Sequence, residues 1–328
     1  MKFQTRTNHR SRLRLVLAVA MASTAMAACG SSDTAVSTGT TAAASTTETA
    51  PDTPDADAAD NEAAESDDAQ VEQPQRIVSL SPTATEMLFA IGAGDQVIAV
   101  DSLSNVPADA PVTDLSAFVP NLEAIAAEDP DLVVLSFDPG DIVNGLEDAG
   151  IPTMLQAPAA TLDDVYAQLA DLGVATGQID GAADVVAELR ASIEEIVAAT
   201  PVVDEPIRVY HEIDGTFFSA SSNSFIGQLY GLLGVTNIAD EADTDGSGYP
   251  QLSPEYILQA DPQLIVIPEL AGYTAAEVSA RPGWEVISAV QNEAVLVVND
   301  DLSSRWGPRI PEFLSIISAA IVAQQVGA

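Results

Sequence analysis

Basic residues are scarce in this chain and very unevenly distributed. The 328 residues contain 11 Lys and Arg against 49 Asp and Glu. Five of the eleven, including the only lysine, lie within residues 1–28, where there is no acidic residue. The rest of the chain therefore carries a formal charge of −43 (6 − 49). Because nucleic acids and anionic lipid surfaces are bound through basic patches, this balance excludes both as partners.

Histidine and cysteine are nearly absent as well, which limits metal binding and catalysis. The chain has two histidines, of which only His211 lies beyond residue 28, and one cysteine. A zinc or manganese site uses several imidazoles, so only coordination by carboxylate oxygens stays open. The sequence has no GxxxxGK[ST], HExxH or GxSxG motif. We therefore expect no enzymatic activity and no cofactor. We interpret His211 as an ordinary strand residue, with axial ligation of a metal centre as the alternative.

Residues 1–28 have the pattern of an export signal. A basic head is followed by an apolar run from Leu13 to Ala28, and Cys29 comes next. This pattern predicts a signal peptide, since the run is short and rich in Ala and Ser for a spanning helix. The lone cysteine has no partner for an internal disulfide. Its position after Ala27 and Ala28 resembles the lipobox of bacterial lipoproteins. That resemblance implies lipidation of Cys29 and anchoring to the outer face of the cell membrane; an ordinary secretory signal is the alternative.

Residues 29–75 predict a disordered acidic tether. Ser, Thr, Ala, Asp, Glu and Pro dominate this stretch, and Val36 and Val71 are its only large apolar residues. Such a composition buries too little surface to offset the entropy of ordering the chain. A folded module therefore begins near Arg76.

Short apolar runs alternate with helical patterns from residue 76 to the end. Strands are predicted at 76–80, 96–101, 131–137 and 151–157, and again at 207–213, 263–268 and 294–300. This alternation predicts an α/β fold with parallel sheets covered on both faces. Between the two series, residues 179–201 predict one long helix with an apolar stripe that includes Leu189 and Ile193. We therefore expect an N-terminal lobe at 76–178, a connecting helix at 179–201 and a C-terminal lobe at 202–328.

One stretch of sequence is nearly repeated. Residues 121–136 read NLEAIAAEDPDLVVLS, and residues 253–268 read SPEYILQADPQLIVIP. Glu123 and Glu255 are 132 positions apart (255 − 123), and an Asp-Pro pair follows each of them by six residues. The two lobes therefore present the same acid in the same local context.

Several motifs together resemble a known family. They are RIVSLSPTATEMLFAIGAGDQVIAV (76–100), the repeated glutamate helix, DPDLVVLS (129–136), the single connecting helix and SRWGPRI (304–310). In number and order they resemble the class III substrate-binding proteins of ABC importers, which bind vitamin B12, ferric siderophores or haem. The resemblance covers residues 76–328. It implies two Rossmann-like lobes joined by one long helix, a ligand cleft between them, and a monomer that serves a permease dimer with its ATPase.

The resemblance also gives the repeated acids a role. In family members that bind vitamin B12, one glutamate on each lobe docks against arginines of the two permease subunits. Glu123 and Glu255 match those positions. A carboxylate accepts a bidentate contact from Arg, and negative charge is favoured in the first turn of a helix. A helix-terminal acid without a partner is the alternative for each residue taken alone.

Residues at the ends of strands are the candidates for the ligand cleft. Ser81 and Thr83 start a helix, where a simple helix cap is the alternative. Phe118 and Phe137 adjoin Ala117 and Ser136, where the resemblance places tryptophans. The full candidate set is Ser81, Thr83, Phe137, Asp138, Phe218, Tyr249, Asp301, Arg305 and Trp306.

The composition of this set bears on the ligand. Aromatic residues beside an open cleft suit a flat macrocycle or a catechol. Phe218 could instead belong to the core and Arg305 to a structural ion pair, and we expect Arg309 to be structural. An anionic ferric siderophore needs a cluster of basic residues that this chain lacks. We therefore expect a metal chelate, with a corrinoid ahead of a siderophore or haem. A scavenging or sensory lipoprotein without an importer is the alternative function.

Overall fold

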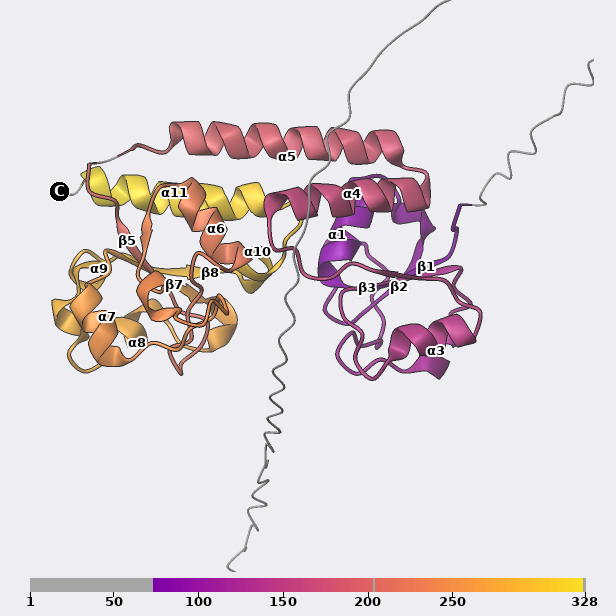
Figure 1. Cartoon of the computed structure of the whole chain (residues 1–328), viewed down its shortest axis with the longest axis horizontal. Coiled ribbons are helices and arrows are strands. Elements are labelled where there is room, and N and C mark those ends of the chain that lie inside the picture. Colours follow the sequence, from indigo (N-terminus) through magenta and orange to yellow (C-terminus); the bar gives the residue numbers. More distant parts are fainter. Residues whose placement is uncertain (1–72, 203, 327–328) are drawn as a thin grey trace, which may run out of the picture. The chain divides into compact units, whose positions relative to one another are not determined.

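The computed structural model describes residues 73–202 and 204–326, which fall within one compact unit of the chain, residues 68–328. The signal peptide, Cys29 and nearly all of the tether therefore lie outside the described residues. The expected α/β fold with two parallel sheets is confirmed, because each half of the described chain builds one four-stranded parallel sheet (Figure 1).

The first lobe has the strand order β2-β1-β3-β4. Every residue of the inner strands β1 and β3 is buried, whereas the edge strand β4 is partly exposed. These inner strands read IVSL and LVVL and are apolar apart from the buried Ser79, the pattern of a sheet covered on both faces. The elements are β1 Ile77–Leu80, α1 Pro82–Ala90, η1 Gly94–Gln96, β2 Val97–Val100, α2 Leu122–Ala127, β3 Leu132–Leu135, α3 Ile142–Asp148, β4 Thr153–Leu155 and α4 Leu162–Thr176.

The second lobe repeats this plan, with the strand order β6-β5-β7-β8. The pair Ile77 and Leu132 in β1 and β3 corresponds to the pair Val209 and Leu264 in β5 and β7, so the register is the same after a shift of 132. The strands are β5 Arg208–His211, β6 Thr236–Asn237, β7 Leu264–Pro268 and β8 Val295–Val298. The helices are α6 Phe225–Leu232, η2 Asp240–Ala242, α7 Pro254–Ala260, η3 Glu269–Ala271, α8 Ala275–Ser279, η4 Trp284–Val286, α9 Ser288–Gln291, α10 Asp300–Ser304 and α11 Ile310–Val326.

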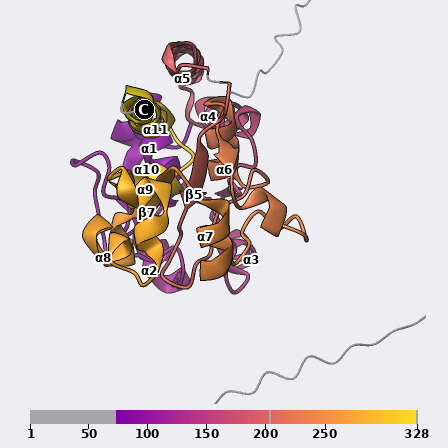
Figure 2. The ribbon, with the colours of Figure 1, turned by 90° about the vertical axis from the view of Figure 1, so that its left-hand side faces the viewer.

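One helix, α5 Ile179–Ala199, connects the two lobes. Its 21 residues make a rod of about 31 Å. It packs on α4 of the first lobe and on α11 of the second, and both views show these three helices together (Figures 1 and 2). Leu189 and Ile193 are buried, whereas Glu188 and Glu194 are exposed, as the apolar stripe predicts. The two-residue strand β6 was not predicted, because its sequence, Thr-Asn, carries no apolar pattern.

Among the described residues, no helix combines the length and the apolar character needed to cross a membrane.

Candidate functional site

A cavity of about 470 Å³ lies between the lobes, at the carboxyl ends of their strands. Residues that follow β1, β2 and β3 line it from the first lobe, and residues that follow β7 and β8 line it from the second. Open parallel sheets bind ligands at this edge, because the loops that leave the strands converge there. The lining residues are Leu80–Thr83, Asp101–Leu103, Asn105, Ala117, Phe118, Ser136, Phe137, Leu270, Asp300, Asp301 and Ser304–Trp306.

The walls of this cavity expose apolar side chains to solvent. Phe118 and Phe137 stack with their ring centroids 6.0 Å apart and their planes at 26°. Phe118 is 65% exposed and Phe137 is 43% exposed. Leu103 lies on the same lobe, and Leu270 on the other is 83% exposed. Exposed apolar surface that gathers around a concavity is typical of a ligand site.

Several hydroxyl groups of the first lobe line the cavity. Ser81 is the N-cap of α1 and accepts a hydrogen bond from the Ala84 amide at 3.1 Å. Its Oγ also accepts a hydrogen bond from Ser136 Oγ at 2.6 Å. Thr83, in the first turn, lines the cavity and is 4% exposed. Ser81 therefore both caps the helix and lines the cavity, so the two readings of the sequence are compatible.

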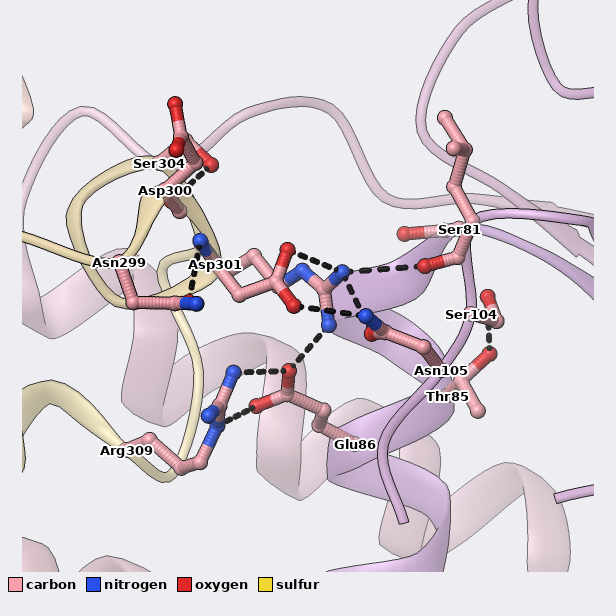
Figure 3. A network of polar contacts seen from close by, with 12 residues as sticks. Ser81, Thr85, Glu86, Ser104, Asn105, Asn299, Asp300, Asp301, Ser304 and Arg309 are labelled. Carbon is pink, nitrogen blue, oxygen red and sulfur yellow. Dashed lines mark hydrogen bonds and ion pairs between the residues drawn. The ribbon is translucent and has the colours of Figure 1, made fainter. Parts of the chain in front are cut away.

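A charged cluster joins the lobes at one end of the cavity (Figure 3). Glu86 of α1 binds the guanidiniums of Arg305 and Arg309, at 2.7 and 2.9 Å. Arg305 also donates to Asp301 Oδ1 at 2.6 Å, and Asp301 Oδ2 accepts from Asn105 at 2.9 Å. The side chain of Arg305 is 8% exposed. The structure thus places Arg305 and Asp301 in the lining of the cavity and in interlobe ion pairs at once.

Every arginine in the described part of the chain has a protein partner. Arg76 and Arg208 donate to carbonyls at helix C-termini, and the other four pair with carboxylates. Arg281 and Glu212, for example, form a 2.6 Å ion pair in which the glutamate side chain is 0% exposed. The remaining partners are Asp163 for Arg190 and Glu86 for Arg305 and Arg309. The described residues therefore offer the cavity no uncommitted guanidinium.

Trp306 reaches across to the first lobe. Its Nε1 donates to Oε1 of Gln168 on α4 at 2.9 Å, while Gln168 Nε2 donates to the carbonyl of Ala157 at 2.7 Å. The indole lines the cavity and is only partly exposed. This hydrogen bond orients the indole ring, which contributes apolar surface to the wall of the cavity.

Four other candidates lie outside the lining of the cavity. Phe218 and Tyr249 belong to second-lobe loops and are 38% and 47% exposed. Asp138 accepts a hydrogen bond from the Val143 amide at the start of α3. His211 is 3% exposed, and its Nδ1 lies 2.8 Å from the hydroxyl of Tyr230. Burial lowers the pKa of His211 to about 4. The structure thus places this imidazole in the core of the second lobe.

The sequence does not single out three residues of the cavity and of the charged cluster beside it. Glu86 lies inside α1, and only the fold brings the two arginines against it. Asn105 lies in an irregular loop whose path no periodicity predicts. Asp101 directly follows β2, and its position at a strand end is a signal that could have identified it.

Asp101 is the most deeply buried acid of the cavity, at 1% exposed. Its Oδ1 accepts a hydrogen bond from Ser104 Oγ at 2.6 Å. Its Oδ2 is buried and has no hydrogen-bond partner among the described residues. Burial raises the pKa of Asp101, and the Ser104 hydroxyl, the nearby amides of Leu103 and Ser104 and the charge of Arg305 oppose that rise.

The repeated glutamates occupy equivalent positions. Asn121 caps α2 and Ser253 caps α7, and in each helix the glutamate is the second helical residue and is exposed. Both helices end before an aspartate with positive φ, Asp129 at 52° and Asp261 at 47°. In Figure 2, α2 and α7 both lie at the end of the molecule opposite α5. One side of the protein thus presents the same acid from each lobe.

A pair of arginines holds these two helices in the same way. Arg76 Nε donates to the carbonyl of Asp129 at 2.6 Å, and Arg208 Nε donates to the carbonyl of Asp261 at 2.9 Å. The arginines are 132 positions apart (208 − 76), as are the glutamates. A cation at a helix C-terminus satisfies free carbonyls and complements the helix dipole. The repeat therefore extends to the groups that anchor the glutamate helices.

Comparison with known proteins agrees with this architecture. The family model described as periplasmic binding protein matches residues 77–302. An ABC transporter substrate-binding lipoprotein of Bacillus subtilis, YvrC, named as uncharacterized, is 29% identical over 258 residues, which cover 76% of this chain and 80% of that protein. The vitamin B12-binding protein of Pectobacterium atrosepticum is 32% identical over 247 residues, which cover 72% of this chain and 85% of that protein.

A solved structure shows the same fold. The periplasmic heme-binding protein RhuT from a Roseiflexus species matches with a TM-score of 0.68 at 23% identity, over 76% of this chain and 99% of that chain. The family match, the two relatives and the cleft between two like lobes lead to one conclusion. The chain belongs to the periplasmic binding protein family and is a substrate-binding protein of ABC transport.

Proposed function

We propose that this protein is an exported lipoprotein, anchored through Cys29, that captures a metal chelate and delivers it to an ABC importer. The observation that carries the ligand part is the cavity between the lobes, with its aromatic wall. A flat macrocycle can bury one face against Phe118 and Phe137 and an edge against Trp306. Aromatic rings supply large apolar contact at low cost in conformational entropy.

A corrinoid is the first candidate among the chelates. The relative from Pectobacterium atrosepticum carries the name of a vitamin B12-binding protein at 32% identity. The cavity also lacks an uncommitted guanidinium among its described residues, which disfavours a strongly anionic ferric siderophore. Haem, whose two propionates are anionic, and neutral ferric hydroxamates are the next candidates.

The matched glutamates support delivery to a permease. Two like lobes that address two like subunits must present the same group twice, and Glu123 and Glu255 do so on one side of the molecule. Both are exposed, and neither has an ion-pair partner in the described part of the chain. A solvated carboxylate of this kind can accept a bidentate contact from arginine. We infer a monomer that binds the permease dimer and its ATPase.

The test is thermal unfolding of the purified protein with a panel of ligands. Cyanocobalamin, cobinamide, haem, a ferric hydroxamate and a ferric catecholate are each added at increasing concentration. A ligand at a hundred times its dissociation constant adds about 2.7 kcal/mol to the free energy of unfolding, which raises the melting temperature visibly. A shift with a corrinoid supports the first candidate. No shift with any member of the panel would exclude the chelate assignment while leaving the family membership intact.

A further inference from the structure

Trp306 belongs to the second lobe but is held by the first. It follows α10, and its indole lines the cavity. Its Nε1 donates to Oε1 of Gln168 on α4 at 2.9 Å. Gln168 itself does not line the cavity. Any effect of this glutamine on a bound ligand must therefore pass through the indole.

The side-chain amide of Gln168 is fixed within the first lobe. Its Nε2 donates to the carbonyl of Ala157 at 2.7 Å, and its backbone carbonyl accepts a hydrogen bond from Nε2 of Gln156 at 2.9 Å. Gln156 and Ala157 directly follow β4, and Gln156 is 5% exposed. An amide whose nitrogen is committed presents its oxygen in a set direction, because the two atoms share one plane. The first lobe thus sets the direction of the acceptor that is offered to Trp306.

The same set of hydrogen bonds reaches the aromatic wall of the first lobe. The backbone amide of Gln156 donates to the carbonyl of Leu135 at 2.8 Å. Leu135 is the last residue of β3, and Phe137 follows it by two positions in the lining of the cavity. The path therefore runs from the strand that carries Phe137, through Gln156 and Gln168, to Trp306. It connects aromatic residues that the two lobes contribute to one cavity.

We propose that Gln168 is a positioning residue of the ligand site: through its hydrogen bond to Nε1 it holds the indole of Trp306 in one orientation, and so contributes to affinity without touching the ligand. This inference rests on the proposed function and adds a residue to it. An indole that is free to turn must be ordered when a ligand binds, which lowers affinity roughly two- to tenfold for one side chain. A ring that is already held avoids this cost.

A second glutamine makes a comparable contact between the lobes, away from the cavity. Nε2 of Gln228 on α6 donates to the carbonyl of Ala160, just before α4, at 2.6 Å. Like Gln168, Gln228 is half-buried and does not line the cavity. Gln228→Leu therefore removes an interlobe hydrogen bond without releasing Trp306. It is the matched control that separates holding the lobes from holding the ring.

The first experiment follows the indole N–H groups of the ligand-free protein by ¹H–¹⁵N NMR. The chain has two tryptophans, and Trp306→Phe identifies which signal belongs to Trp306. We expect Gln168→Leu to speed the exchange of the Trp306 indole hydrogen with solvent by about tenfold or more, and Gln228→Leu to leave it within about threefold. The indole of Trp284, which is 2% exposed, is the internal control and should not respond. An unchanged exchange rate for Trp306 in Gln168→Leu would overturn the inference.

The second experiment measures affinity by isothermal titration. Cyanocobalamin is the first probe, and haem and a ferric hydroxamate are used in turn if it does not bind. We expect Gln168→Leu to weaken binding about fivefold and Gln228→Leu less than about twofold. In a Trp306→Phe background, Gln168→Leu should add less than about twofold, because the group through which it acts is gone. Equal effects with and without the indole, or equal effects of the two glutamine variants, would overturn the inference.

The outcomes separate this inference from the proposed function. If none of the three probes binds, the proposed function fails, and the inference that rests on it fails as well. If a probe binds wild type and Gln168→Leu equally well, only the inference fails. If Gln168→Leu does not fold, the wild-type protein decides the matter. Its Trp306 indole hydrogen should then exchange about tenfold or more slowly than that of free tryptophan, and exchange at the free rate would overturn the inference.

Discussion

Glu86 Oε1 accepts a 2.7 Å hydrogen bond from Arg305 Nη1, which joins two residues 219 positions apart and belonging to different lobes. The exposed fractions of the two side chains are 2% and 8%. Glu86 Oε2 is bound in turn by Arg309 Nε at 2.9 Å. One buried carboxylate is thus shared by two guanidiniums beside the cavity (Figure 3). Together with α5, this contact joins the two lobes beside the cavity.

Replacement of Glu86 by Gln is expected to destabilise the protein by about 3 kcal/mol, because it leaves the buried guanidinium of Arg305 and the partly exposed guanidinium of Arg309 without this carboxylate. The free energy of unfolding from urea titrations measures this effect. Glu188→Gln, on the exposed side of α5, is the matched control and should change stability by less than about 0.5 kcal/mol. Equal stability of the two variants would show that the Glu86 contacts contribute nothing net to folding.

The aromatic wall of the cavity is expected to contribute to the affinity for the ligand. Phe137→Ala removes one ring of the stacked pair and should weaken ligand binding roughly tenfold or more, since buried aromatic contacts dominate binding energy. Tyr249→Ala removes a ring of similar exposure that does not line the cavity, and a change below about threefold is expected. Isothermal titration with the panel ligand that binds gives both values. A larger loss from Tyr249→Ala would mean that the ligand contacts the second lobe beyond the present cavity.

The order of elements could be predicted from the sequence because each strand and helix carries its own local signal. The runs IVSL, LVVL and LIVIP predict buried parallel strands, and Ser81 predicts a helix start that the structure confirms. The repeat around Glu123 and Glu255 predicts the equivalence of the lobes, and the two sheets have that equivalence.

The cavity could be predicted only in part, because its residues converge through tertiary packing. Ser81, Thr83 and Phe137 lie in its lining because each follows a strand end. Asp301, Arg305 and Trp306 also lie there, in α10 and directly after it. The partnership of Arg305 with Glu86 could not be predicted, because α1 and the segment after α10 meet only once both lobes are built. The unsatisfied oxygen of Asp101 could not be predicted either, since hydrogen-bond partners depend on side-chain placement that no periodicity records.

The buried imidazole of His211 should make stability depend on pH. Burial lowers its pKa in the folded protein to about 4, from an ordinary value of 6.5. Below pH 6.5 the unfolded chain takes up a proton there that the folded chain does not, so acidification favours unfolding until the pH falls through 4. Between pH 7 and pH 5 this group should cost about 2 kcal/mol. Urea unfolding of wild type and of His211→Gln at both pH values measures the difference, and identical pH dependence would contradict it.

Because Glu123 and Glu255 occupy equivalent positions, we expect both to take part in ligand uptake. Both residues take the second position of a capped helix, and both helices are held at their C-termini by an arginine. Each glutamate helix is thus anchored by an arginine at the end away from its acid. A partner with a twofold arrangement of arginines would match it, and reversing the charge of the two acids would turn attraction into repulsion.

The double variant Glu123→Arg, Glu255→Arg is therefore expected to abolish uptake of the ligand while leaving its affinity within about threefold of the wild-type value, because neither residue lines the cavity. Uptake is measured in proteoliposomes that hold the cognate permease and ATPase, and affinity by fluorescence titration. Glu188→Arg with Glu195→Arg is the control, since it makes the same charge change on α5, at the opposite end of the molecule from α2 and α7. Loss of affinity in the docking variant, or equal loss of uptake in the control, would contradict docking through these acids. Uptake that survives the double reversal would instead favour a binding lipoprotein that works without this contact.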